Sequence, residues 1–148
     1  MLKILTCCAA LLALPAAACV DTPLIEQEIH LAAINTERAR HDHPPLALSP
    51  ELGRIAQAHA CDMARRGYFS HTSPDGQSMM DRARRAGLSG LCAMGENIAQ
   101  GQRDVPTVVT SWMRSPGHRR NILDREYRLV GFGRGPGATW VQVFAAPC

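Results

Sequence analysis

Apolar side chains recur at helical spacing in three parts of the chain, which predicts three amphipathic helices. The stripes that show this spacing are Ile25, Ile29, Ala32, Ala33 and Thr36; Leu52, Ile55, Ala56, His59 and Met63; and Val105, Val108, Val109 and Trp112. Each stripe is expected to face the core, since an amphipathic helix buries its apolar side. The first helix is expected to run to about Arg40 and the second to about Arg66.

Residues that start helices precede the first two stripes and open a further short helix. Thr22-Pro23 and Ser49-Pro50 each place a capping side chain before a proline, a pattern typical of a helix start. Ser78 with Asp81 three residues later resembles a capping box and predicts a short helix that Gly87 closes.

The third helix is expected to end before a candidate functional residue. Pro116 disfavours helix at the residue before it, and Gly117 permits a sharp turn. His118 is therefore expected in a turn just past the helix end, beside the anchor that Trp112 provides.

The end of the chain reads as a hairpin. Tyr127 to Arg134 and Thr139 to Phe144 are predicted strands, joined by the glycine-rich segment 133–137. That segment is not a phosphate-binding loop, because no helix and no lysine follow it. Glu96 to Ala99 is expected to be a buried segment, extended or weakly helical.

The first 18 residues are typical of a secretory signal peptide. A lysine precedes a short apolar run from Ile4 to Leu14, and small residues precede Cys19. Residues 19–148 would then form a single domain. The small residues fit an ordinary signal peptidase, but they also resemble a lipoprotein box, in which Cys19 would carry a lipid and anchor the protein to a membrane. We expect soluble export to the periplasm or the extracellular space.

Four cysteines remain after cleavage, which in an exported chain suggests two disulfides with three possible pairings. Cys61 and Cys92 lie inside the domain, whereas Cys19 and Cys148 are its ends. We therefore expect the pairs Cys61–Cys92 and Cys19–Cys148. A lipid on Cys19 would exclude the second pair.

The charge of the chain argues against a nucleic-acid partner. The net charge is only +3, and acids are interspersed among the arginine clusters at 65–66, 82–85 and 119–120. These clusters are interpreted as solvated helix faces. His41 and His43 precede two prolines and are interpreted as loop residues, whereas His59 is interpreted as a hydrogen-bonded core residue.

Three titratable residues stand beside apolar anchors: His71 after Phe69, Glu96 before Ile98, and His118 after Trp112. They are 25 and 22 residues apart, a spacing that matches no local metal motif. A glutamate bordered by apolar residues and glycines needs a partner if it is buried.

The motifs around these residues, in order, resemble those of the CAP superfamily (cysteine-rich secretory proteins, antigen 5 and pathogenesis-related proteins) in its short bacterial form. The matching segments are Phe69-Ser70-His71, Gly95-Glu96-Asn97-Ile98-Ala99, the run from Trp112 to Leu123, and Val130-Gly131-Phe132-Gly133. The resemblance runs from about Leu24 to Phe144.

The resemblance implies an α+β fold, a three-layer α-β-α sandwich with a small antiparallel sheet between helices. It also implies a cleft in which two histidines and two acids meet and can bind a divalent metal, often zinc. His71, Glu96 and His118 match three of the four. The second acid is missing, because residues 113–116 carry no carboxylate and include an arginine.

Three functions stay open at this point. The first is a monomeric, non-enzymatic module that binds a small apolar or cell-envelope ligand in the His71, Glu96 and His118 cleft. The second is a metal-dependent hydrolase or peptidase that uses a zinc ion in the same cleft. In the third, the three residues are purely structural and tie a loop to the core.

Overall fold

The computed structural model describes residues 18–148, so the predicted signal peptide lies almost wholly outside the described residues. The elements, in chain order, are α1 (Leu24–Ala39), β1 (Ala47–Leu48), α2 (Pro50–Arg66), α3 (Met79–Arg85), β2 (Leu91–Gln100), α4 (Val105–Arg114), α5 (Pro116–Ile122), β3 (Leu129–Gly135) and β4 (Thr139–Pro147). No helix in this part of the chain is both long and apolar enough to cross a membrane.

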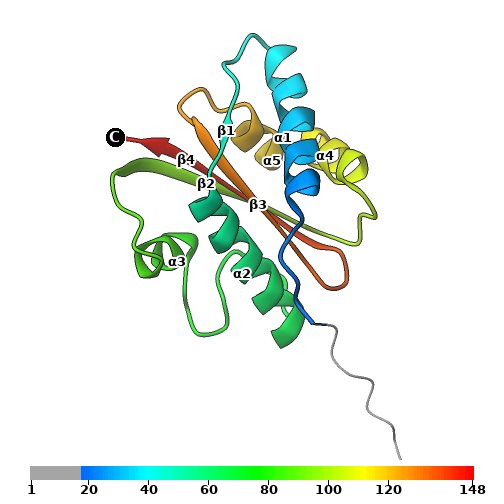
Figure 1. The fold of residues 1–148 in the computed structure, drawn as a ribbon, viewed down its shortest axis with the longest axis vertical. Coiled ribbons are helices and arrows are strands. Elements are labelled where there is room, and N and C mark those ends of the chain that lie inside the picture. Colours follow the sequence, from blue (N-terminus) through cyan, green and yellow to red (C-terminus); the bar gives the residue numbers. More distant parts are fainter. Residues whose placement is uncertain (1–17) are drawn as a thin grey trace, which may run out of the picture.

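A four-stranded sheet in the order β1-β3-β4-β2 forms the middle layer. Alternate residues of β4 point to opposite faces: Trp140 and Phe144 join a core with α1, α4 and α5, and Val141 and Val143 join a second core with α2 and α3. Figure 1 shows the two helical groups on either side of the strands. The expected α+β sandwich is confirmed, although the two-residue β1 pairs parallel to β3 and makes the sheet mixed.

The ends of α2 and the start of α3 lie where the local sequence signals predict them. Ser49 Oγ accepts a hydrogen bond from the Leu52 amide, and Gly67 closes α2 at φ 67°. The Ser78–Asp81 capping box of α3 is present with both of its hydrogen bonds.

The buried face of α1 differs from the predicted one. Ile25 and Ile29 are 64% and 48% exposed, whereas His30, Ile34 and Arg38 are buried. Periodicity misplaced the face because two polar residues are accommodated in the core: the His30 ring stacks on Phe132, and Arg38 finds hydrogen-bond acceptors. The Arg38 guanidinium donates to the carbonyls of three residues outside α1: Pro44, Ile122 and Asp124. It thereby joins α1 to the end of α5.

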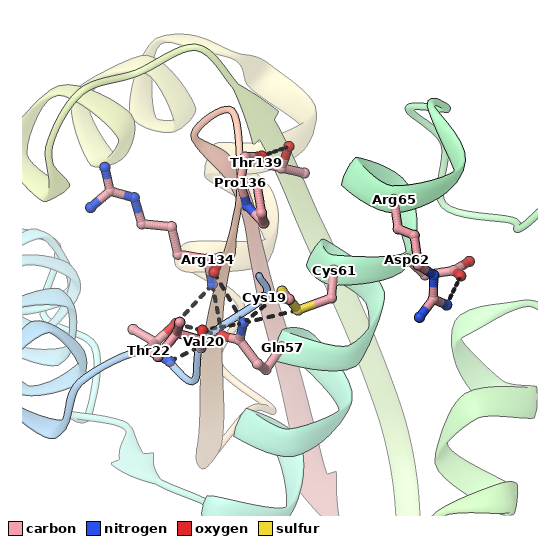
Figure 2. Close-up of a disulfide and its surroundings, with 10 residues drawn as sticks. All are labelled: Cys19, Val20, Thr22, Gln57, Cys61, Asp62, Arg65, Arg134, Pro136 and Thr139. Carbon is pink, nitrogen blue, oxygen red and sulfur yellow. Dashed lines mark hydrogen bonds and ion pairs between the residues drawn. A yellow bond between two sulfur atoms is a disulfide. The ribbon is translucent and has the colours of Figure 1, made fainter. Parts of the chain in front are cut away.

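Residues 20–22, which lead into α1, are held by Gln57 of α2 rather than by a helix cap. Thr22 does not cap α1; its hydroxyl donates to Gln57 Oε1 at 2.6 Å. The Gln57 amide nitrogen donates to the carbonyls of Val20 and Arg134, so one side chain joins the N-terminal segment, α2 and β3. Figure 2 shows this group beside the disulfide between Cys19 and Cys61.

The disulfides are Cys19–Cys61 and Cys92–Cys148, with Cα atoms 5.7 and 4.9 Å apart, so the pairing expected from the sequence is wrong. The antiparallel register of β2 and β4 pairs Leu91 with Pro147 and brings Cys92 to the C-terminus. The N-terminal segment instead runs along α2. A lipid on Cys19 would therefore leave Cys61 unpaired.

α2 packs on β3 at backbone distance because three glycines of β3 face it. A Cβ built on Gly131 would lie 2.1 Å from the Gly53 nitrogen, and one on Gly133 would lie 2.2 Å from the Gln57 nitrogen. A Cβ on Gly135 would lie 2.5 Å from the Ala60 oxygen. The stripe at every second residue thus permits the close contact between helix and strand.

We predict that Gly133→Ala destabilises the protein by about 2 kcal/mol or more, because the added methyl group would overlap the α2 backbone. Chemical denaturation measures the change. Gly117→Ala is the control, since its Cβ would meet nothing within 4 Å and the position is helical. It should be neutral or slightly stabilising. Equal losses from both variants would contradict the prediction.

His30 predicts a pH dependence of stability. Its two ring nitrogens are buried without hydrogen-bond partners among the described residues, and the ring stacks 4.4 Å from Phe132. Burial, aided by the charge of Arg134, lowers the His30 pKa to about 3. Because the unfolded chain would protonate at the ordinary value of 6.5, stability should be intact above pH 6.5 and fall by up to about 1.4 kcal/mol per pH unit below it, until the pH approaches 3.

His30→Phe should remove that part of the slope when the free energy of unfolding is measured between about pH 4 and 6. His41→Phe, at a surface loop, is the matched control and should keep the wild-type slope. An unchanged slope in His30→Phe would refute the assignment.

Candidate functional site

The candidate site is built around one buried carboxylate. Glu96 lies within β2 with its side chain 3% exposed, and both of its oxygens are hydrogen-bonded. Oε1 accepts from His71 Nδ1 at 2.8 Å, and Oε2 accepts from Arg82 at 2.7 Å. Glu96 therefore has the partners that a buried acid requires.

The turn that follows α2 positions His71. The carbonyl of Ser70 accepts from the buried His59 ring at 3.0 Å, and the carbonyl of His71 accepts from Arg82 at 3.1 Å. Since a carboxylate can only accept, the His71 proton must lie on Nδ1, which leaves Nε2 as the available ring nitrogen. The His71 side chain is 55% exposed, so the ring combines a fixed orientation with access to solvent.

His118 reaches the same area from α5. The sequence predicted a turn at this point, but that prediction is wrong. Pro116 instead starts α5, and His118 lies in the first turn of that helix. A helix can begin at Pro116 because proline is tolerated at the first helical position, where the missing N–H would have no partner within the helix. Burial first, and then the charge of His71, lower the His118 pKa below its ordinary value, so His118 is neutral at pH 7 and near His71.

A network of side-chain amides joins α5 to β2. Asn97 Nδ2 donates to the carbonyl of His118 at 3.1 Å and to Gln142 Oε1. Asn121 Nδ2 donates to the carbonyl of Glu96 at 3.1 Å and to Asn97 Oδ1 at 2.9 Å. The structure therefore joins the His71 side chain directly to Glu96 and ties the backbone of His118 to Asn97, the next residue of the same strand.

Sequence reasoning missed Arg82 as a member of the site. It was grouped with solvated arginines, yet its side chain is 11% exposed and makes an ion pair with Glu96. The missing second acid was a signal that could have indicated such an arginine. A buried carboxylate that does not bind a metal needs a cation from the chain itself. His59 is a core residue, as expected, 3.9 Å from Glu96, and burial lowers its pKa.

The donor set does not fit a zinc ion. Within residues 18–148, no three His, Cys, Asp or Glu side chains are grouped so that they could hold a metal ion. His71 and Arg82 already occupy the two Glu96 oxygens, and the guanidinium would repel a second cation. Metal ligation by His71, Glu96 and His118 therefore gains no support.

The other histidine pair lies in a loop, as the sequence suggested. The His41 and His43 rings stack 6.4 Å apart, and each accepts a hydrogen bond from an arginine, Arg119 and Arg125 respectively. His41 Nδ1 also donates to the carbonyl of Glu37, so both nitrogens of that ring are engaged.

Comparison with known proteins places the chain among bacterial relatives. Residues 31–145 match the model of the Cysteine-rich secretory protein family (CAP). The uncharacterized protein YkwD of Bacillus subtilis (strain 168) is 40% identical over 111 residues, which cover 74% of this chain and 43% of YkwD. The chain thus spans less than half the length of that relative.

Two solved structures share the fold. An extracellular protein containing a SCP domain from Bacillus anthracis str. Ames is 31% identical with a TM-score of 0.77, and the match covers 82% of this chain and 40% of that one. An outer surface protein from Borrelia burgdorferi is 20% identical with a TM-score of 0.75, and the match covers 82% and 92% of the two chains. The second likeness concerns the fold alone.

We predict that Arg82→Gln destabilises the protein by about 3 kcal/mol, because it leaves the Glu96 carboxylate buried without its cation. The measurement is denaturant unfolding at neutral pH. Arg84→Gln on the same helix is the control, since the Arg84–Asp81 pair is largely exposed, and it should change stability little. Adding Glu96→Gln to Arg82→Gln should recover part of the loss. Similar losses from the two single arginine variants would contradict this reading of the site.

Proposed function

Because the chain belongs to the cysteine-rich secretory protein (CAP) family, we propose that it is an exported, non-enzymatic module that binds a cell-envelope ligand in the cleft around His71, Glu96 and His118. One observation carries the proposal: both Glu96 oxygens are engaged by His71 and Arg82. The acid is therefore used to orient the site and is not free to act as a base.

The chemistry that remains available suits recognition of a ligand. His71 keeps Nε2 available on a half-exposed ring, and burial lowers the pKa of His118. The two imidazoles, that of His71 held by the buried Glu96, can exchange hydrogen bonds with the hydroxyl, amide or ester groups of a glycan or lipid. Preorganised groups of this kind bind with little loss of side-chain entropy.

Export is supported by three observations. The first 18 residues are typical of a secretory signal. Both disulfides would persist in the oxidising conditions outside the cytoplasm. The B. anthracis relative is described as extracellular. The Cys19–Cys61 bridge favours release without a lipid, because an acylated Cys19 could not form it.

The alternative, a metal-dependent hydrolase, has less support in this chain. It needs an ion with an open position for water, whereas no metal-binding group of three ligands exists within residues 18–148. The length of chain that the relatives have in addition could carry activities of its own, so their roles are not transferred to this domain.

The test is to titrate the protein with solubilised cell-wall fragments and, separately, with lipid vesicles, while following the ring resonances of His71 and His118 by NMR. We expect one of these preparations to shift both resonances and the His71→Ala plus His118→Ala variant to lose binding by about tenfold or more. His41→Ala plus His43→Ala is the matched control and should bind as wild type does.

Two results would overturn the proposal. One is the absence of binding to any wall fragment or lipid. The other is retention of zinc after dialysis together with peptidase activity, both lost in the His71→Ala plus His118→Ala variant, which would establish the hydrolase instead.

A further inference from the structure

A second cavity lies between α2, α3 and the turn at 73–77, with a volume of about 500 Å³. This size is within the range of small-molecule sites. His71, Glu96 and His118 do not line this cavity, but His59 and Arg82 do. Arg82 therefore lies between the cavity and Glu96 and contacts both.

The cavity carries an excess of positive charge. Five arginines line it, at positions 54, 65, 66, 82 and 85, against two acids, Asp62 and Asp75. Both acids already have partners: Asp62 accepts from Arg65, Arg66 and Tyr68, and Asp75 accepts from Arg66 and Gln77.

Two of the lining arginines, Arg54 and Arg85, have guanidinium groups without a close acidic partner within residues 18–148. Arg54 makes one long contact, 3.6 Å, with the exposed Glu51. Arg85 makes no ion pair with any residue in the described range 18–148. These two side chains are free to turn toward an anion in the cavity.

Arg82 supplies a donor that the fold itself does not use. Its terminal nitrogens donate to Glu96, His71 and Gln77, which hold the guanidinium in place. Its Nε is buried and has no hydrogen-bond partner within residues 18–148. A buried donor left unpaired costs about 1–3 kcal/mol, so a ligand oxygen that accepted from it would remove that cost.

The remaining part of the lining is apolar. Ile55 and Ala58 of α2 and Ala86 after α3 contribute side chains without polar atoms. A ligand that matches the whole cavity would therefore combine a charged group with a small apolar body.

We propose that this cavity binds an organic phosphate monoester, with the phosphate held by Arg54, Arg82 and Arg85 and the apolar part resting on Ile55, Ala58 and Ala86. Several guanidinium groups around one cavity match a doubly charged phosphate better than a singly charged carboxylate, because the planar forks of Arg54 and Arg85 can each donate two parallel hydrogen bonds to phosphate oxygens, while Arg82 adds its charge and its Nε donor.

Calorimetric titration of the disulfide-bonded protein with phenyl phosphate tests the proposal. Phenyl phosphate should bind several-fold more tightly than inorganic phosphate, which lacks the apolar part, and than phenylacetate, which carries a single charge. Arg54→Gln plus Arg85→Gln should weaken phenyl phosphate binding by about tenfold or more. Ala58→Glu, at an exposed helix position, should abolish it by placing an acid in the cavity.

The control is Arg114→Gln plus Arg120→Gln, which removes the same two charges from exposed positions that do not line the cavity. This variant should retain wild-type affinity. Equal weakening in both double variants would show a nonspecific charge effect and overturn the proposal. Equal affinity for phenylacetate would overturn the assignment to phosphate, and no measurable binding of phenyl phosphate would overturn the site.

Discussion

A carboxylate removed from water must be paired, and in this protein that requirement joins parts of the chain that lie 14 to 25 residues from Glu96 in sequence. Glu96 is paired through its side chain with the loop after α2 and with α3, and its carbonyl accepts from Asn121 of α5. The neighbouring Asn97 extends the contact to His118 and to β4. A loop, the short helices α3 and α5, and the strand β4 therefore meet at two consecutive residues of β2. The site is rigid because neither residue can give up its partners without leaving buried polar atoms unsatisfied.

Arginines also pair with buried acceptors elsewhere in the fold. Arg82 supplies the positive charge that balances Glu96, and Arg38 donates to the carbonyls of Pro44, Ile122 and Asp124. Arg134 packs over the ring of Trp140 at 4.4 Å and pairs with Glu26. Three arginines of a chain with few lysines thus take structural positions. Guanidinium suits them, since its planar donors can satisfy several acceptors at once.

The position of Arg82 links the two sites that we propose. It is held by Glu96 and by loop carbonyls, it also lines the arginine-rich cavity, and its buried Nε has no partner within residues 18–148. In the cleft, the Glu96 carboxylate orients His71 and neutralises Arg82. The CAP fold accordingly acts here as a scaffold that presents histidines and arginines from short helices and turns.

Local signals in the sequence determined much of the secondary structure. The Ser49 cap, the Ser78–Asp81 capping box and the stripe from Val105 to Trp112 all form as expected, because each depends on residues close together in the chain. The ordered motifs around His71, Glu96 and His118 also indicated the family, and with it the sandwich. Only the tertiary structure decided which face of α1 is buried, how the cysteines pair and that Arg82 occupies the site. Each of these depends on a partner dozens of residues away or on another element, such as the carbonyls that accept from Arg38 or the strand register that brings Cys92 to Cys148, and periodicity within one segment carries no information about such a partner.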